Sequence, residues 1–340
     1  MKRTNLTSKD ISVVIQGNPC GTRESPALYT RKLSESIRKH LPEAEIIVST
    51  WEDQNVEGIH WDKLQLSRPV PMTYVIRPDE KLYPQTVNHQ LITSRSGIQA
   101  ASRKYVLKIR SDMILENDRI LKMWNHYAET PRIEGIQSCI SRERIMVLPT
   151  YNHRRGMCFP YNVCDWLFFG SKEDILDLFH IPLMDLDALC VRNGEKYPRV
   201  EDNMGAEQYI WIEYMKQKHV NSNLKGAMDT DEKELMLFEE TIAQNLIMAS
   251  ARKLGVNSQK MPGSGYASKP CLSQGLYTFS EWKRLCNQYA GSKFKLCWNP
   301  IEDAVYVLAL KLREKIRGGN VKLYGFIIMS VRKVRAKHGA

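Results

Sequence analysis

The chain has 340 residues, with 49 lysines and arginines against 38 aspartates and glutamates, so its formal net charge is +11. Residues 311–340 hold nine of the basic residues and one acid, so this segment carries +8 and the rest of the chain carries +3. A nearly neutral body argues against a domain that binds nucleic acid over its whole surface. No run approaches the roughly 18 apolar residues of a membrane span, and the polar N-terminus does not match a secretory signal.

The first 120 residues alternate between patterns typical of buried strands and of amphipathic helices. The first strand is the continuous apolar run ISVVIQ, which ends at Gly17. Apolar residues at helical spacing predict helices over residues 28–41 and 84–102. Four strands are predicted: Ile11–Gln16, Glu45–Ser49, Met72–Arg77 and Tyr105–Ile109.

Repeated β-α-β units of this size predict a mostly parallel sheet with right-handed crossovers. Ligands of such sheets bind outside the carboxyl ends of the strands. The residues that follow the predicted strands are therefore expected to converge on one edge of the sheet. They are Gln16, Gly17, Trp51, Glu52, Arg110 and Asp112.

The second half of the chain is less regular and mostly helical. It contains one predicted strand, Asp165–Phe169, and a short helix that starts at Lys172. Further helices are predicted over Ala206–Lys218, Glu234–Leu254, a segment capped by Ser280, and Asn299–Arg317. The simplest architecture is one α/β body with a helical C-terminal part.

Most familiar enzyme motifs are missing from the sequence, including the phosphate loop, the dinucleotide fingerprint, the H-E-x-x-H zinc motif and the nucleophile elbow. What remains is Asp112 at a strand end, close to Arg110. A strand-end carboxylate can bind Mg²⁺ or Mn²⁺, and an arginine can pair with phosphates. A solvated turn with an aspartate cap is the competing interpretation.

Three stretches resemble the WavE-type lipopolysaccharide synthesis proteins: ISVVIQG, SESIRKHLPEAEIIVSTWE and TVNHQLITSRSGIQAASRKYVLKIRSDM. Together they cover about residues 11–113, and DWLFFGSKEDILDLF continues the resemblance. These proteins are regarded as glycosyltransferases of the GT-A type. The resemblance thus implies a GT-A-like, Rossmann-like fold and a nucleotide-sugar donor.

GT-A enzymes hold a divalent cation and the sugar nucleotide with a D-x-D motif. Here the corresponding residues are Arg110-Ser111-Asp112, so only the last acid is present. The resemblance makes Asp112 the expected ligand of Mn²⁺ or Mg²⁺, although the missing first acid puts metal dependence in doubt. The donor-binding residues that it implies are Gln16, Gly17, Glu52, Asn88, Arg95, Arg110 and Asp112.

Inverting transfer also needs a carboxylate that deprotonates the acceptor hydroxyl. The candidates in the second half are Asp165, Glu201, Asp202 and Glu207. Glu207 opens a predicted helix, the position of the catalytic acid in inverting GT-A enzymes, so Glu207 and Asp202 rank above Asp165. An acid at a helix N-terminus is also favourable for purely structural reasons.

We therefore expect a glycosyltransferase that adds a sugar to a lipopolysaccharide or related surface glycan. The expected parts are a transferase domain over residues 1–230, a helical part over 231–317 and a basic amphipathic tail over 318–340. A sugar nucleotidyltransferase is one alternative. A non-catalytic protein that binds membrane or nucleic acid through the basic tail is another.

The basic segment 311–340 interleaves cations with apolar residues, a pattern that favours the anionic cytoplasmic leaflet of the inner membrane over nucleic acid. We expect a cytoplasmic protein held peripherally at that surface, where a lipid-linked glycan acceptor would lie. A core-packed helix is the alternative. A second basic cluster is a candidate contact for an anionic acceptor: Arg142, Arg144, His153, Arg154 and Arg155.

Overall fold

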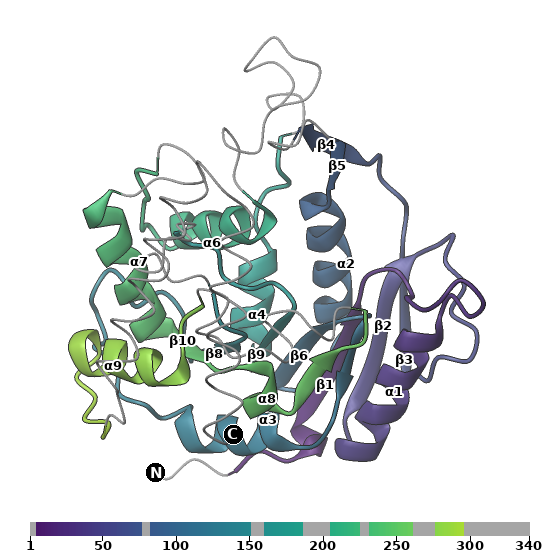
Figure 1. Ribbon diagram of the computed structural model, residues 1–340, viewed down its shortest axis with the longest axis horizontal. Helices are drawn as coiled ribbons and strands as arrows, with labels where there is room; N and C mark the ends of the chain where they lie inside the picture. The colour runs from purple at the N-terminus through teal and green to yellow at the C-terminus, as the bar shows by residue number, and fades with distance from the viewer. Residues whose placement is uncertain are drawn as a thin grey trace, which may run out of the picture.

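A computed structural model describes residues 5–76, 82–150, 160–185, 205–224, 231–260 and 276–295 (Figure 1). Its centre is a seven-stranded sheet. In spatial order the strands are Leu246–Met248 (β10), Ile145–Val147 (β8), Leu167–Ser171 (β9), Tyr105–Arg110 (β6), Ile11–Gln16 (β1), Glu45–Trp51 (β2) and Lys63–Ser67 (β3). The predicted α/β, Rossmann-like class is confirmed.

The sheet is mostly parallel around β1. Strand β1 pairs in parallel with both β2 and β6, and β3 pairs in parallel with β2. Strand β9 runs antiparallel to its neighbours β6 and β8, and β10 closes the far edge in parallel with β8. All residues of β1 and β2 are buried, which explains their continuous apolar sequence.

Helices cover both faces of this sheet, as Figure 1 shows. Helix α2 packs on β1, β2 and β3 and lies beside α4 and α6, whereas α1 packs against the short strand Met113–Leu115 (β7). None of the described helices is both long and apolar enough to cross a bilayer. The helices are Leu28–His40 (α1), Val87–Ala100 (α2), Arg119–Tyr127 (α3), Lys172–Phe179 (α4), Ala206–Gln217 (α6), Glu232–Asn245 (α7), Ala251–Leu254 (α8) and Phe279–Tyr289 (α9), with a 3₁₀ turn at Ser8–Asp10.

The predicted third strand of the sheet is wrong. Its position is taken by β3, which begins after Asp62, whose carboxylate accepts a hydrogen bond from the Ile46 amide at 2.7 Å. The segment Thr73–Ile76 (β4) instead forms an antiparallel hairpin with Leu82–Gln85 (β5). Strand β3 was not predicted because it lies at an edge of the sheet, where half-exposed polar residues interrupt the run of apolar residues.

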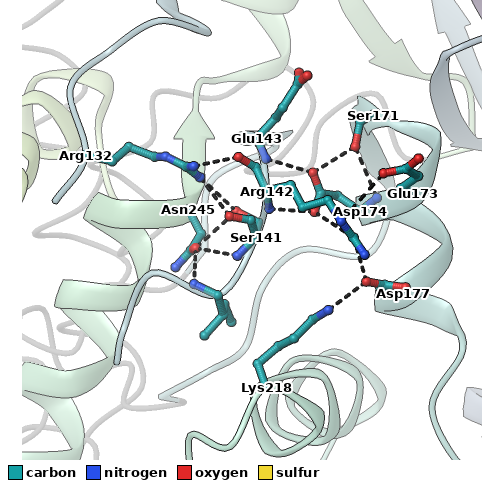
Figure 2. Close-up of polar contacts among 11 residues, drawn as sticks. Arg132, Ser141, Arg142, Glu143, Ser171, Glu173, Asp174, Asp177, Lys218 and Asn245 are labelled. Carbon is teal, nitrogen blue, oxygen red and sulfur yellow. Dashed lines mark hydrogen bonds and ion pairs between the residues drawn. The ribbon is translucent and has the colours of Figure 1, made fainter. Parts of the chain in front are cut away.

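The predicted long helix over Glu234–Leu254 is also wrong, because it breaks at Asn245. The buried Asn245 amide accepts hydrogen bonds from Ile140 N and Ser141 N, and Figure 2 shows its contact with Ser141. It also donates to Ser138 O at 2.7 Å. These contacts turn the next three residues into β10, which joins the sheet edge before the short helix α8 begins. The sheet therefore includes a strand from the part of the chain beyond residue 231.

Two smaller boundaries differ from prediction. Helix α9 is capped by Thr278, not by Ser280, through a reciprocal capping box with Glu281. Strand β9 begins at Leu167, so Asp165 lies in the turn before it.

A second two-stranded ribbon, Met113–Leu115 (β7) with Val256–Ser258 (β11), was not predicted. The predicted helix over Asn299–Arg317 and the basic tail lie outside the described residues.

Candidate active site

A cleft of about 460 Å³ opens at the carboxyl ends of β1, β2 and β6. From β1 the chain moves to β2 on one side, and after α2 it returns to β6 on the other, so the cleft lies where the strand order reverses. Such a switch point is where open α/β sheets bind ligands. The cleft is lined by Gln16, Gly17, Asn18, Pro19, Cys20, Trp51, Met72, Thr86, His89, Gln90, Thr93, Arg110, Ser111, Asp112, Asp165 and Lys260.

The end of β1 shapes one wall of the cleft. The Gln16 side chain is buried, and its Nε2 donates to Thr93 Oγ1 on α2 at 2.8 Å. Gly17 has φ +105°, a backbone conformation that residues with a Cβ rarely adopt. Its amide donates to Ser49 O, and Ser111 N donates to Gln16 O, which joins the ends of the three strands. The structure thus brings Gln16 and Gly17 to the predicted edge.

Arg110 and Asp112 form a bidentate ion pair in the cleft. Arg110 Nε donates to Asp112 Oδ1 at 3.1 Å, and Nη2 donates to Oδ2 at 2.8 Å. The Trp166 ring lies 4.7 Å from the guanidinium carbon. The Arg110 side chain is 30% exposed and that of Asp112 only 4%. The pair therefore presents a cation to the cleft and keeps its carboxylate behind it.

Lys108 lies beneath this pair, two residues earlier on the same face of β6. It is fully buried, and its Nζ donates to Asp165 O at 2.6 Å. The rings of Phe168 and Phe179 lie 5.9 and 5.5 Å from Nζ. Burial lowers the pKa of Lys108 to about 8, and the Asp165 carboxylate opposes this shift. Lys108 thus fixes the turn that carries Asp165.

Asp165 faces these cations from the turn before β9. Its Oδ1 is buried, and no hydrogen-bond partner for it lies within the described ranges. Burial lowers the pKa of Arg110, but the charges of Asp112 and Asp165 offset this effect and raise it overall. Asp165 therefore contributes negative potential to the site, with one oxygen that is not used by the described protein groups.

Glu207 stands in the first turn of α6, close enough to sense the same charges. Burial and the Asp165 carboxylate raise the pKa of Glu207 from 4.5 to about 7. The helix N-terminus, Arg110 and Lys108 act in the opposite direction. A carboxyl group with a pKa near neutrality can exchange a proton at working pH, as a general base must. Asp202, the other preferred base, lies outside the described residues.

Three predicted donor-binding residues do not line the cleft. Glu52 is exposed beyond the end of β2. Asn88 is buried and exchanges two hydrogen bonds with the Met184 backbone, at 2.8 and 3.0 Å. Arg95 donates to Phe179 O and Ile181 O, at the end of α4. The last two side chains hold α2 against the segment that follows α4.

The basic cluster expected around Arg142 and Arg144 does not present free cations. Figure 2 shows Arg142 directed at the acidic face of α4, where Nη1 lies 2.8 Å from Asp177 Oδ2. Lys218 Nζ reaches the same carboxylate at 2.6 Å. Arg144 is 1% exposed and donates to four backbone carbonyls, so it is a core residue. The prediction is wrong for Arg144, whereas Arg142, which is ion-paired but 53% exposed, stays a predicted acceptor contact; residues 153–155 lie outside the described ranges.

Sequence reasoning missed most of the polar face that α2 turns toward the cleft. Thr86, His89, Gln90 and Thr93 follow the i, i+3, i+4, i+7 spacing of one helix face, a signal that was available in the sequence. His89 Nε2 lies 3.0 Å from Val70 O, and its ring packs edge-on against Trp51 with centroids 5.2 Å apart. Trp51 and His89 thus form an aromatic wall of the cleft.

The residues around Asp112 do not fit a divalent cation. Both oxygens of Asp112 accept hydrogen bonds from the Arg110 guanidinium, whose positive charge would repel a metal bound there. Within the described ranges, no group of three or more histidines, cysteines, aspartates or glutamates could hold a metal ion. A metal at Asp112 therefore stays a prediction that rests on the resemblance alone.

The family model for WavE lipopolysaccharide synthesis matches residues 11–306. The chain belongs to this family. The match confirms the resemblance first seen in residues 11–113 and places the WavE chain in lipopolysaccharide synthesis. It spans every strand of the central sheet and both walls of the cleft, and it ends before the basic segment 311–340. No curated protein matches the chain.

Proposed function

We propose that this WavE protein is a GT-A-like glycosyltransferase that moves a sugar from a nucleotide-sugar donor to a lipopolysaccharide or related surface-glycan acceptor. The observation that carries the proposal is a cleft with a cation for a diphosphate, beside which lies a carboxylate for an acceptor hydroxyl, and the pKa of this carboxylate responds to the charges of Arg110 and Asp165 in that cleft. Arg110 supplies the cation. Glu207 supplies the carboxylate, with a pKa raised to about 7.

The donor diphosphate would lie against Arg110, because guanidinium groups pair with phosphate oxygens through parallel hydrogen bonds. The nucleoside would extend along the β1 end, where the aromatic wall of Trp51 and His89 offers a stacking surface. At Gly17 the absence of a side chain allows the backbone to approach the ligand closely. This placement assigns Gln16, Gly17, Trp51 and Arg110 to the donor.

In the reaction, the acceptor hydroxyl oxygen attacks the anomeric carbon of the donor sugar. The hydroxyl proton passes to the Glu207 carboxylate. The bond between the anomeric carbon and the diphosphate oxygen breaks, and its electron pair leaves with the nucleoside diphosphate. Arg110 stabilises the charge that develops on this leaving group. The stereochemistry would be inverting, since a single displacement with the hydroxyl attacking from the face opposite the leaving diphosphate inverts the anomeric carbon.

The test is incubation of the purified full-length chain with UDP-, GDP-, ADP- and CMP-sugars and a delipidated or intact lipopolysaccharide core acceptor. Transfer with release of nucleoside diphosphate or CMP supports the proposal. In a parallel incubation with nucleoside triphosphates and a sugar 1-phosphate, release of pyrophosphate would instead identify a sugar nucleotidyltransferase. If none of the nucleotides binds, the transferase proposal fails.

The acceptor side carries a further part of the proposal. A lipid-linked acceptor would meet the protein at the cytoplasmic face of the inner membrane, with the basic segment 311–340 as the contact. Flotation of the full chain and of a chain truncated after residue 310 with anionic vesicles tests this contact. The full chain is expected to float and the truncated chain to remain in the soluble fraction. Equal flotation of both would refute the role of the segment.

A further inference from the structure

The ion pair of Arg110 and Asp112 has the form of a built phosphate site, not of a metal site. Asp112 holds Arg110 through two hydrogen bonds, and the Trp166 ring covers one side of the guanidinium. These contacts occupy Nε and one hydrogen of Nη2. The two hydrogens of Nη1 have no acceptor among the described residues, and Arg110 lines the cleft. They are available to a ligand.

The charges around the cleft also favour an anion over a cation. Each described carboxylate that lines it is matched by a cation: Asp112 by Arg110, and Asp165 by Arg110 and Lys108. Lys260 adds a further positive charge at the rim. A divalent cation takes several oxygen ligands at once, whereas the described residues gather no group of three or more histidines, cysteines, aspartates or glutamates, and Asp165 Oδ1 is a single unused carboxylate oxygen.

The local backbone keeps this arrangement in place. Ser111 Oγ donates to Asn18 O at 2.5 Å, and Asp112 O accepts from Gln259 N at 2.8 Å. Arg110 N donates to Trp166 O at 3.1 Å. The turn is thus bound to β1, to β9 and to the segment after β11, so the guanidinium is held before any ligand arrives.

We propose that the Arg110 guanidinium, anchored by Asp112 and Trp166, replaces the divalent cation at the donor diphosphate, so that this protein binds its donor without metal. The proposal rests on the proposed transferase function and specifies the chemistry of its donor site. Asp112 then acts as a positioning residue for Arg110. The ligand class is a nucleoside diphosphate, free or carrying a sugar.

The experiment is calorimetric titration of the full-length chain with UDP, GDP, ADP and CMP, once with EDTA and once with Mn²⁺. A second measurement follows free Mn²⁺ by electron paramagnetic resonance as protein is added without nucleotide. We expect at least one diphosphate to bind with the same Kd, within about twofold, in both conditions, and the Mn²⁺ signal to persist. These two measurements need no variant, so a misfolded mutant cannot obscure them.

Variants then assign the role. Arg110→Gln is expected to weaken the binding of the diphosphate by about 10- to 100-fold with EDTA and with Mn²⁺ alike. Asp112→Asn is expected to weaken it less, because the cation remains. Arg38→Gln is the matched control, since Arg38 Nη2 donates to both carboxylate oxygens of Asp62, at 2.9 and 3.0 Å, outside the cleft. It should leave the Kd unchanged.

The outcomes separate the two proposals. Binding of a diphosphate that requires Mn²⁺, or loss of Mn²⁺ binding in Asp112→Asn, would overturn the metal-free site and leave the transferase function standing. Binding of CMP alone would overturn the diphosphate site. If no nucleotide binds in either condition, the proposed function itself fails, and the inference fails with it.

Discussion

Replacement of Glu207 by glutamine tests the proposed base most directly. The change keeps the shape of the side chain and removes its ability to take a proton. We expect kcat to fall by about 10²- to 10⁴-fold, the usual contribution of a general base, with little change in the donor KM. Glu213→Gln is the matched control, because Glu213 lies on the same helix and pairs at the surface with Lys216. Its kcat should match that of the wild type.

The raised pKa of Glu207 fixes the shape of the pH profile. The wild-type kcat/KM should rise with pH and level off above about 7, because only the ionised carboxylate accepts the proton. Asp165→Asn should move this limb to lower pH, since the Asp165 charge is the second cause of the shift after burial. Rates of nucleotide release measured across pH 5 to 9 for the wild type and for Asp165→Asn give the rising limb of each enzyme.

The raised pKa of Glu207 also predicts how the free energy of unfolding depends on pH. Between the unfolded value of 4.5 and the folded value of about 7, the folded chain binds more protons at Glu207 than the unfolded chain does. The free energy of unfolding should therefore fall as pH rises through this window, by a total on the order of 3 kcal/mol. Glu207→Gln should lack this fall, so its stability relative to wild type should be greater at pH 8 than at pH 5. A wild-type rate in Glu207→Gln, or identical pH dependence of urea unfolding, would refute the assignment.

Three further predictions concern the scaffold. Gly97→Ala should destabilise by about 1–3 kcal/mol in urea unfolding, because the added Cβ would lie 2.5 Å from Val14 Cγ1; Gln99→Ala on the exposed face of α2 is the control. In the wild type, the free energy of unfolding should rise between pH 8 and 10.5, because the folded chain binds fewer protons at Lys108 than the unfolded chain does. Lys108→Met should lack this rise. Asn245→Ala should lower the free energy of unfolding by at least about 3 kcal/mol, because it leaves several buried backbone groups without partners. Unchanged unfolding midpoints, or an unchanged pH slope for Lys108→Met, would contradict these three expectations.

Parts of the site were readable from the sequence because they follow directly from strand ends. Gln16, Gly17, Arg110 and Asp112 end two parallel strands that lie side by side in register, so they converge wherever the sheet forms. Asn88 and Arg95 were misplaced because a helix has several polar faces, and only packing decides which of them meets the cleft. The family match agrees with the stretches that carried the resemblance.

The sequence by itself determined the class of the fold, the central strands and the family. Long apolar runs that alternate with amphipathic helices are typical of parallel strands covered by helices on both faces, and this pattern acts locally along the chain. The tertiary structure decided that β3 takes the edge of the sheet, that the chain breaks at Asn245, and that Asp112 faces Arg110 with both oxygens. It also decided that burial and Asp165 raise the pKa of Glu207. Apart from the pair of Arg110 and Asp112, these features arise from groups far apart in the sequence, whose hydrogen bonds and charges meet only after the chain has folded.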